Sequence, residues 1–320
     1  LKNKSTVKQE HQHSGFFYKP SGVADEEARK WLPRDFASKL ITHSVKRNID
    51  RKRTSIDHVQ IVRDVPLFSW VELNLNELCN RKCPFCPRSG DYPNQNIHMD
   101  PGLAAAIALQ LDELDFSGTV NISGTGEPLL TRNLLEIVKC FCDRQISIEI
   151  VTNGDKLNPV LIKDLYSIGL SHLVISMYDG PEQIDYFNSL FKECKIDKSK
   201  YTLRDRWYNE DEDFGLIYTN RTGAQKELKK AATRPCYYPH YALYIDWNGD
   251  VLLCCQDMYN RTVKFGNVAE KPIFDIWRDK RLNDFRDKLK SGQRCLSPCS
   301  NCDANGMLFG KNHAAKWQTI

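Results

Sequence analysis

Residues 68–90 read FSWVELNLNELCNRKCPFCPRSG and join an alternating segment to three closely spaced cysteines. Apolar and polar side chains alternate along the first part, in the order Val71, Glu72, Leu73, Asn74, Leu75 and Asn76. This period of two predicts a strand with a buried face and a polar face that looks into a cavity. Cys79, Cys83 and Cys86 follow in the spacing C-x3-C-x2-C. Three thiolates are one short of the four that usually hold a cubic iron–sulfur cluster, which leaves an open coordination position for chemistry.

Two other interpretations of these cysteines are a structural zinc knuckle and scattered buried thiols. Structural zinc sites usually use paired C-x2-C units, and no second local pair follows Cys86. The chain of 320 residues contains 12 cysteines, which are clustered rather than spread like a disulfide framework. Clustered cysteines favour a metal-binding protein of the cytoplasm.

The composition is that of an ordinary globular protein, with 41% hydrophobic and 27% charged residues and a net charge of +4. The sequence has no run of about 18 apolar residues and begins without the apolar region of a signal peptide, so we expect no membrane partner. Residues 44–53, SVKRNIDRKR, are locally basic. The favoured interpretation is a solvated helix face, and the alternative is a docking patch for an acidic electron donor or an anionic substrate. No aromatic side chains interleave with these charges, so nucleic acid is not an expected partner.

Strand and helix patterns alternate from residue 67 onward. We expect strands within 68–78, 117–123, 145–154 and 171–180, and helices within 99–114, 129–144 and 158–170. Asp100 is the expected N-cap of the first of these helices, and Pro101 its first residue. Such alternation predicts a parallel βα series, whose ligands collect at the carboxyl ends of the strands. Further on, we expect a hairpin within 241–255 with its turn at Asn248-Gly249, and a helix over about 272–290.

The C-x3-C-x2-C motif resembles the signature of the radical S-adenosylmethionine (radical SAM) superfamily, and the similarity covers roughly residues 67–310. The resemblance implies an α/β fold, a partial (βα)6 TIM-like barrel with a small C-terminal β-hairpin and helix iron–sulfur domain. It implies a polar extension at 1–64, a core domain at 65–230 and an auxiliary domain at 231–320. In this family the three cysteines bind a [4Fe-4S] cluster. Its fourth iron binds S-adenosylmethionine, which is cleaved to a 5′-deoxyadenosyl radical.

The resemblance also implies contacts to S-adenosylmethionine. The segment GTGEP matches the family's Gly-Gly-Glu-Pro motif, with a threonine in place of the second glycine. Arg204 is placed to bind the methionine carboxylate, with Arg206 as its competitor and a surface salt bridge as the plain alternative. Asn153 and Ser176 lie in segments that end in Asn-Gly and Asp-Gly, and the alternative is that these segments only form turns. The expected contact residues are Phe85 beside the adenine, Gly124, Thr125, Gly126 and Glu127 along the methionine, Asn153 near the ribose, Ser176 near the ribose or the carboxylate, and Arg204.

The C-terminal cysteines resemble a second family pattern. Cys236, Gly249 and Cys254 match the opening of a SPASM domain, C-x(9–15)-G-x4-C, but the closing part is shortened to C-x3-C-x2-C. This implies the shorter twitch form with one auxiliary [4Fe-4S] cluster. The expected ligands are Cys236, Cys254, Cys299 and Cys302, whereas Cys255 and Cys295 are alternates or free thiols. A structural zinc ion and a second radical-generating site are the other interpretations of this region.

The single auxiliary cluster resembles that of enzymes of the 2-deoxy-scyllo-inosamine dehydrogenase type. It implies a radical SAM dehydrogenase or epimerase that acts on a carbohydrate or aminocyclitol-type small molecule, with a flavodoxin or ferredoxin as electron donor. The candidate catalytic residues are Cys255, Glu72, Tyr178 and Asp179. A peptide-modifying maturase of the ribosomal-peptide or sulfatase type is the second hypothesis. An iron–sulfur electron carrier without enzymatic activity is the third.

Overall fold

The computed structural model describes residues 43–206, 219–225, 228 and 232–317. These residues form an eight-stranded sheet in the order β10-β9-β8-β3-β4-β5-β6-β7, and a separate two-stranded hairpin, β1-β2. The strands of the large sheet are β3 (Trp70–Leu73), β4 (Thr119–Ile122), β5 (Ser147–Thr152), β6 (His172–Met177), β7 (Tyr201–Asp205), β8 (Ala242–Ile245), β9 (Asp250–Leu252) and β10 (Lys264–Asn267). The hairpin strands are β1 (Ile61–Val62) and β2 (Val65–Pro66).

The central part of the sheet is parallel. Strands β3 to β7 follow one another in chain order, and each pairs in parallel with the next. Strand β8 pairs in parallel with the other edge of β3, and β9 and β10 then continue the sheet in antiparallel fashion. The predicted α/β fold with a mostly parallel sheet is therefore confirmed. The sixth parallel strand, however, comes from the hairpin at 242–252, so the C-terminal region extends the same sheet.

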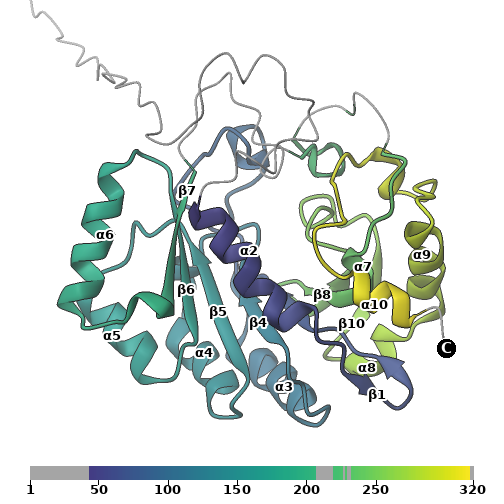
Figure 1. Ribbon diagram of the computed structural model, residues 1–320, viewed down its shortest axis with the longest axis horizontal. Helices are drawn as coiled ribbons and strands as arrows, with labels where there is room; N and C mark the ends of the chain where they lie inside the picture. Colours follow the sequence, from purple (N-terminus) through teal and green to yellow (C-terminus); the bar gives the residue numbers. More distant parts are fainter. Residues whose placement is uncertain (1–42, 207–218, 226–227, 229–231, 318–320) are drawn as a thin grey trace, which may run out of the picture.

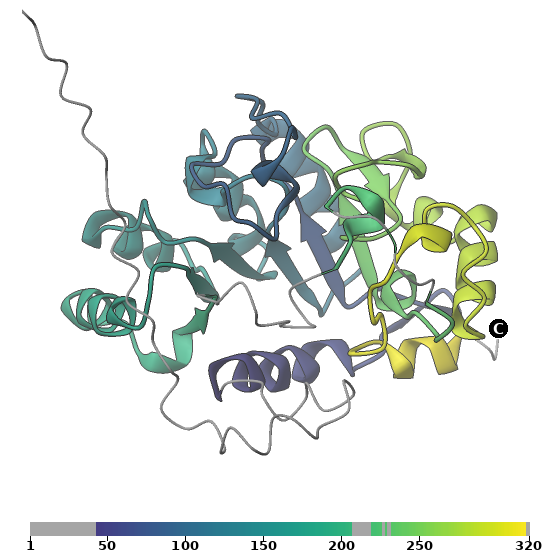
Figure 2. The ribbon, with the colours of Figure 1, turned by 90° about the horizontal axis from the view of Figure 1, so that it is seen from above.

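Helices cover both faces of this sheet. The helices are α2 (His43–Ile56), α3 (Pro101–Asp112), α4 (Leu134–Cys142), α5 (Pro159–Ser167), α6 (Glu182–Glu193), α7 (Tyr238–Tyr241), α8 (Ile273–Trp277), α9 (Lys280–Lys290) and α10 (Lys311–Lys316). Helices α3 to α6 lie along one face, whereas α2 crosses the opposite face between β7 and the C-terminal region (Figures 1 and 2). The face that carries α2 is the polar one.

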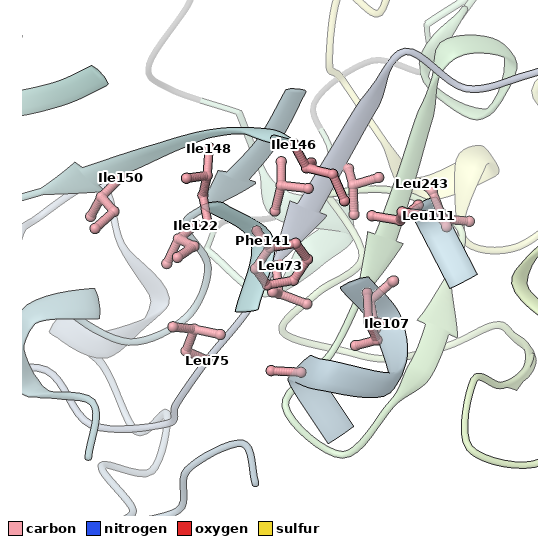
Figure 3. Close-up of a cluster of buried hydrophobic side chains, with 14 of the residues drawn as sticks. Leu73, Leu75, Ile107, Leu111, Ile122, Phe141, Ile146, Ile148, Ile150 and Leu243 are labelled. Atoms are coloured by element: carbon pink, nitrogen blue, oxygen red, sulfur yellow. The ribbon is translucent and has the colours of Figure 1, made fainter. Parts of the chain in front are cut away.

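The predicted capping of the first crossover helix is confirmed. Asp100 accepts hydrogen bonds from the backbone N–H groups of Gly102 and Leu103, and Pro101 opens α3. The apolar faces of the strands and of these helices form one core, which includes Leu73, Ile122, Ile150, Phe141 and Ile107 (Figure 3). Burial of these side chains supplies the main favourable term in folding.

The helix expected over 272–290 is divided in two, so that prediction is wrong in its length. Helix α8 ends at Trp277, and α9 begins at Lys280. The Asp279 side chain accepts from the N–H of Arg281, which caps a new helix at this point. The break also lets the buried Trp277 donate its indole N–H to the carbonyl of Pro66 at 2.8 Å.

Helix α2 contains the basic run, and the run is not simply a solvated face. Arg47 and Arg53 are exposed, as expected. Arg51 and Lys52 instead turn toward the fully buried Glu149 of β5, at 2.5 Å and 3.2 Å. The prediction was wrong for these two residues, because a strand carboxylate that faces the interior needs a cationic partner.

The same ion pairs set the protonation of Glu149. Burial alone would raise the pKa of Glu149, but Lys52 and Arg51 together lower it below its ordinary value. Lys52 also lies 4.3 Å from the centroid of the Trp70 ring, in a cation–π contact. Helix α2 thus closes the polar face near the amino ends of β3 and β5.

We expect Arg51→Ala combined with Lys52→Ala to destabilise the protein by about 3–5 kcal/mol, because the variant leaves Glu149 as an unpaired buried charge. Adding Glu149→Gln should restore much of that loss. The measurement is the free energy of unfolding by denaturant, followed by circular dichroism, with exposed Arg53→Ala as the matched control. Equal stability of the double variant and the control would show that α2 does not compensate Glu149.

Candidate active site

The three cysteines of the first motif lie on the loop that follows β3, at the carboxyl end of the sheet. Cys86 donates its N–H to the carbonyl of Cys83 at 2.9 Å, and the side-chain oxygen of Asn94 accepts from the N–H of Cys79 at 2.8 Å. All three thiols are half-buried. Burial raises the pKa of Cys79, and it raises that of Cys83 to about 12. Three soft thiol donors on one short loop fit a cubic cluster that keeps one iron open.

Arg88 fastens this loop to its surroundings. Its buried guanidinium donates to the carbonyls of Thr125 and Glu77, each at 2.6 Å, and to that of Pro93 at 2.9 Å. The geometry gives it a structural role, because its donors are bound to backbone carbonyls.

The glycines of the GTGEP segment make room for side chains of the first strand. A Cβ atom on Gly124 would overlap the side chain of Asn74, and one on Gly126 would overlap that of Asn76. Thr125 between them is buried, and its hydroxyl donates to Glu77 Oε1 at 2.9 Å. The Asn74 amide in turn donates to that hydroxyl at 3.0 Å. The threonine therefore fits where the family motif has glycine, because its polar atoms find partners.

Glu127 and Asn153 connect the ends of β4 and β5. The Glu127 carboxylate accepts from the hydroxyl of Thr152 at 2.5 Å and from the N–H of Asn153 at 2.9 Å. Burial raises the pKa of Glu127. The Asn153 amide donates to the side chain of Asn80 on the cysteine loop at 2.9 Å. Both predicted cofactor residues thus border the cysteine loop, and their contact with S-adenosylmethionine stays a prediction.

Ser176 and Arg204 lie side by side on β6 and β7. Arg204 Nη2 donates to the Ser176 hydroxyl at 2.6 Å. Within the described ranges, Arg204 Nε is buried and has no hydrogen-bond partner. A buried donor without a partner is costly. A ligand carboxylate would satisfy it, which fits the role predicted for Arg204.

Phe85, Tyr178 and Asp179 meet on the outer side of the cysteine loop. The rings of Phe85 and Tyr178 stack with centroids 5.8 Å apart, and Arg81 lies 5.3 Å from the Tyr178 ring. Arg81 also pairs with Asp179 at 2.7 Å and with Asp155 at 2.5 Å. The hydrogen bond from Arg81 lowers the pKa of Asp179, whereas burial raises that of Tyr178 to about 12. These contacts bind the cysteine loop to β5 and β6, and the catalytic roles predicted for Tyr178 and Asp179 stay predictions.

Glu72 and Cys255 come together on the polar face of the sheet. Each of these two groups affects the pKa of the other, and the charge of Arg221 acts on both. Burial raises the pKa of both groups. Among the described residues, Arg221 Nε and Asn121 Oδ1 are buried without a hydrogen-bond partner. A ligand on this face would therefore meet the carboxyl group of Glu72, the thiol of Cys255 and two polar atoms that are free to form hydrogen bonds.

The cysteines predicted as auxiliary ligands surround one cavity. Cys236, Cys254, Cys299 and Cys302 line it, together with the apolar side chains of Leu253 and Leu289. Neither Cys255 nor the exposed Cys295 lines it. In the described part of the chain no three ligating side chains converge closely enough to hold a single metal ion. Four thiols spread around a cavity fit a cluster better than they fit zinc.

Three functional candidates escaped the sequence reasoning. Tyr259 places its hydroxyl 3.2 Å from the Cys86 sulfur, Arg221 lies beside Glu72, and Arg294 lines the cysteine cavity. No motif marks Tyr259 or Arg221. The position of Arg294 next to Cys295 in the cysteine-rich tail was the one available signal.

Comparison with known proteins agrees with this geometry. The Radical SAM superfamily model matches residues 73–205, and the SPASM model, an iron–sulfur cluster-binding domain, matches residues 236–303. An S-adenosyl-L-methionine-dependent 2-deoxy-scyllo-inosamine dehydrogenase from Niallia circulans is 32% identical over 244 residues, which is 74% of this chain and 93% of the relative. The chain belongs to the radical SAM superfamily.

Solved structures support the same assignment. The crystal structure of BtrN in complex with AdoMet and 2-DOIA matches with a TM-score of 0.66 and 29% identity, over 78% of this chain and 98% of that one. A second structure of BtrN, in an open conformation, gives a TM-score of 0.55 and 27% identity. This radical SAM protein is therefore an oxidoreductase of its family, with a [4Fe-4S] cluster, S-adenosylmethionine and an auxiliary cluster as cofactors. None of its described helices combines the length and the apolar character needed to cross a membrane.

We expect Cys79→Ala, Cys83→Ala and Cys86→Ala each to abolish the formation of 5′-deoxyadenosine, because each removes a ligand of the cleaving cluster. The auxiliary cluster should survive, so that iron falls from about eight to about four atoms per chain. The measurement is anaerobic reconstitution, iron analysis and chromatography of the nucleoside. Cys140→Ala, on α4 away from the motif, is the matched control. Full cleavage in any of the three variants would overturn the ligand assignment.

Proposed function

We propose that this enzyme abstracts a hydrogen atom from a hydroxylated, amino-sugar or aminocyclitol-like small molecule and oxidises it by two electrons. The observation that carries the proposal is the similarity to 2-deoxy-scyllo-inosamine dehydrogenase over nearly the whole of that relative. Its supports are the polar face of the sheet, with Glu72 in its middle, and the enclosed four-cysteine cavity beside it.

The chain's own residues divide the work. When bound, the first cluster and S-adenosylmethionine supply a 5′-deoxyadenosyl radical that takes one hydrogen atom from a substrate carbon. Arg204 and Ser176 would hold the methionine carboxylate, Phe85 the adenine, and Asn153 a ribose hydroxyl. The substrate hydroxyl would give its proton to Glu72. An auxiliary cluster held by Cys236, Cys254, Cys299 and Cys302 would accept the remaining electron. One hydrogen atom, one proton and one electron together make a two-electron oxidation.

Epimerisation is the second candidate, and the position of Cys255 favours it. Its thiol lies beside Glu72 on the same polar face. There it could return a hydrogen atom to the substrate radical from the opposite side. The sulfur radical left behind would take up one proton and one electron, supplied by a carrier of the ferredoxin or flavodoxin class by way of the auxiliary cluster, to restore the thiol. The substrate would then leave with inverted stereochemistry and an unchanged oxidation state.

The remaining assignments belong to the same proposal. We infer a core domain at 65–230 and an auxiliary domain at 231–320, a cytoplasmic location, and a flavodoxin or ferredoxin as the electron donor. The first cluster needs one low-potential electron in each turnover, and carriers of this class supply such electrons. A peptide substrate would instead place the enzyme with the maturases.

Cys255→Ser separates the two outcomes. In a dehydrogenase, we expect the variant to retain most of its oxidised product, because the thiol is not part of that reaction. In an epimerase, the product should be lost while 5′-deoxyadenosine still forms, because the strong O–H bond of serine cannot return a hydrogen atom in place of the thiol. The assay compares a panel of aminocyclitols and amino sugars by mass spectrometry in deuterated water, where epimerisation adds one deuterium. Turnover of a peptide panel alone would overturn both candidates.

Cys299→Ala combined with Cys302→Ala tests the role of the auxiliary cluster. We expect 5′-deoxyadenosine to persist, though more slowly because lost ligands also loosen the C-terminal region. Oxidised product should disappear. The exposed Cys295→Ala serves as the matched control. If product formation survives, the electron does not pass through the auxiliary cluster.

A further inference from the structure

Arg294 is the charged residue that the structure places at the wall of the four-cysteine cavity. Among the described residues that line this cavity, the others are cysteines, apolar side chains or neutral polar ones. The side chain is 7% exposed, so water does not screen it freely. An arginine keeps its charge at every ordinary pH. The auxiliary site is therefore built with one fixed cation at its edge.

The partners of Arg294 leave that charge uncompensated. Its guanidinium donates to the carbonyls of Arg234 at 3.0 Å, Ala304 at 2.8 Å, Pro235 at 3.2 Å and Asn305 at 3.1 Å. All four acceptors are neutral backbone groups, and within the described ranges no carboxylate pairs with it. The hydrogen bonds fix the orientation of the guanidinium but do not neutralise it. A buried cation held in this way needs a negative charge nearby.

Neighbouring acids do not occupy the same place. Asp257 accepts from the Thr262 hydroxyl at 2.7 Å, and Asp303 accepts from the N–H of Asn220 at 2.8 Å. Neither of the two aspartates lines the cavity. Arg294 is thus the charge that a group inside the cavity meets first.

A cluster bound by four thiolates is such a negative group. With four cysteinate ligands a [4Fe-4S] centre carries a net charge of about −2, and about −3 after it takes up one electron. A nearby cation stabilises the more negative state more, because Coulomb energy grows with the product of the charges. The reduction potential of an iron–sulfur centre follows net charge and solvent exposure in this way.

We propose that Arg294 raises the reduction potential of the auxiliary cluster and so makes that cluster the electron acceptor of the reaction. The proposal rests on the proposed function, because it gives the physical reason why an electron leaves the substrate radical in this direction. The substrate radical is oxidised and loses its hydroxyl proton, and the auxiliary cluster is reduced by one electron. That electron then leaves to a soluble one-electron carrier of the ferredoxin or flavodoxin class. Arg294 acts through the cluster and is a positioning residue.

The test is an anaerobic redox titration of the reconstituted full chain, followed by electron paramagnetic resonance. The auxiliary signal is the one that persists when Cys79, Cys83 and Cys86 are all replaced by alanine. We expect Arg294→Gln to shift the auxiliary potential downward by at least the 59 mV that corresponds to a tenfold change in a one-electron equilibrium. Arg294→Lys, which keeps the charge, should stay within that margin of the wild type.

Arg278→Gln is the matched control, since it removes one arginine charge whose side chain is 59% exposed. If Arg294→Gln and Arg278→Gln give the same potential, the proposal is overturned. Should Arg294→Gln fail to take up the auxiliary iron, Arg294→Lys decides alone. An unchanged potential then retains the proposal, and a tenfold shift would assign the effect to the lost hydrogen bonds and overturn it.

The same variants separate this inference from the proposed function. If the potential falls but oxidised product per 5′-deoxyadenosine does not, Arg294 tunes the cluster while the cluster is not the electron acceptor. If the potential is unchanged and Cys299→Ala with Cys302→Ala still removes the product, the acceptor role stands and the tuning by Arg294 is wrong.

Discussion

Strand β3 pairs in parallel on both of its edges, and the positions of both metal sites depend on that pairing. On one side Leu73 is in register with Ile122 of β4, which leads into GTGEP. On the other side Leu73 is in register with Ile245 of β8, whose hairpin partner leads to Cys254 and Cys255. Because strand spacing in a sheet is fixed by backbone hydrogen bonds, the cysteine loop, the GTGEP turn and the auxiliary cysteines keep a set arrangement. Sheet hydrogen bonds between β3 and β8 join the auxiliary region to the barrel.

The side chains of this strand explain several separate features of the site. Asn74 bonds the Thr125 hydroxyl at 3.0 Å and the Asp246 carboxylate at 2.7 Å, so one buried amide connects β3 with the loops on both sides. Asp246 in turn holds Arg261 at 2.5 Å, and Arg261 pairs with Glu77 beside the cysteine loop. A buried network of this kind is stable only when every member is satisfied. The glycines of GTGEP are needed because the side chains of Asn74 and Asn76 occupy the space that a Cβ atom would fill.

The sequence predicted those parts of the fold that depend only on neighbouring residues. The strand at β3, the Asp100-Pro101 helix start and the hairpin turn near Asn248 each depend on neighbouring residues, and each is present. Burial along β3 does not alternate as the pattern predicts, and the turn is centred on Trp247 and Asn248 rather than on Asn248-Gly249. The pairing of β8 with β3 joins residues about 170 positions apart in the chain, and no local period encodes it. The contact of Arg51 and Lys52 with Glu149 is also between residues far apart in the chain. No local pattern showed that the Glu149 side chain would be buried and would need these partners.

Cys254 and Cys255 are neighbours in the chain, but their thiols lie in different surroundings. Cys254 lines the auxiliary cavity, whereas Cys255, the next residue, lies beside Glu72 on the polar face. Both residues lie in the bend and turn that follow β9, and the two thiols face different compartments across one peptide bond. In the proposed reaction, an electron that leaves a substrate near Glu72 would have a short covalent route to the auxiliary site. The same adjacency would let that site reduce a sulfur radical on Cys255. The two proposed reactions, oxidation and epimerisation, would therefore use one arrangement and differ in the direction in which the electron crosses this peptide bond.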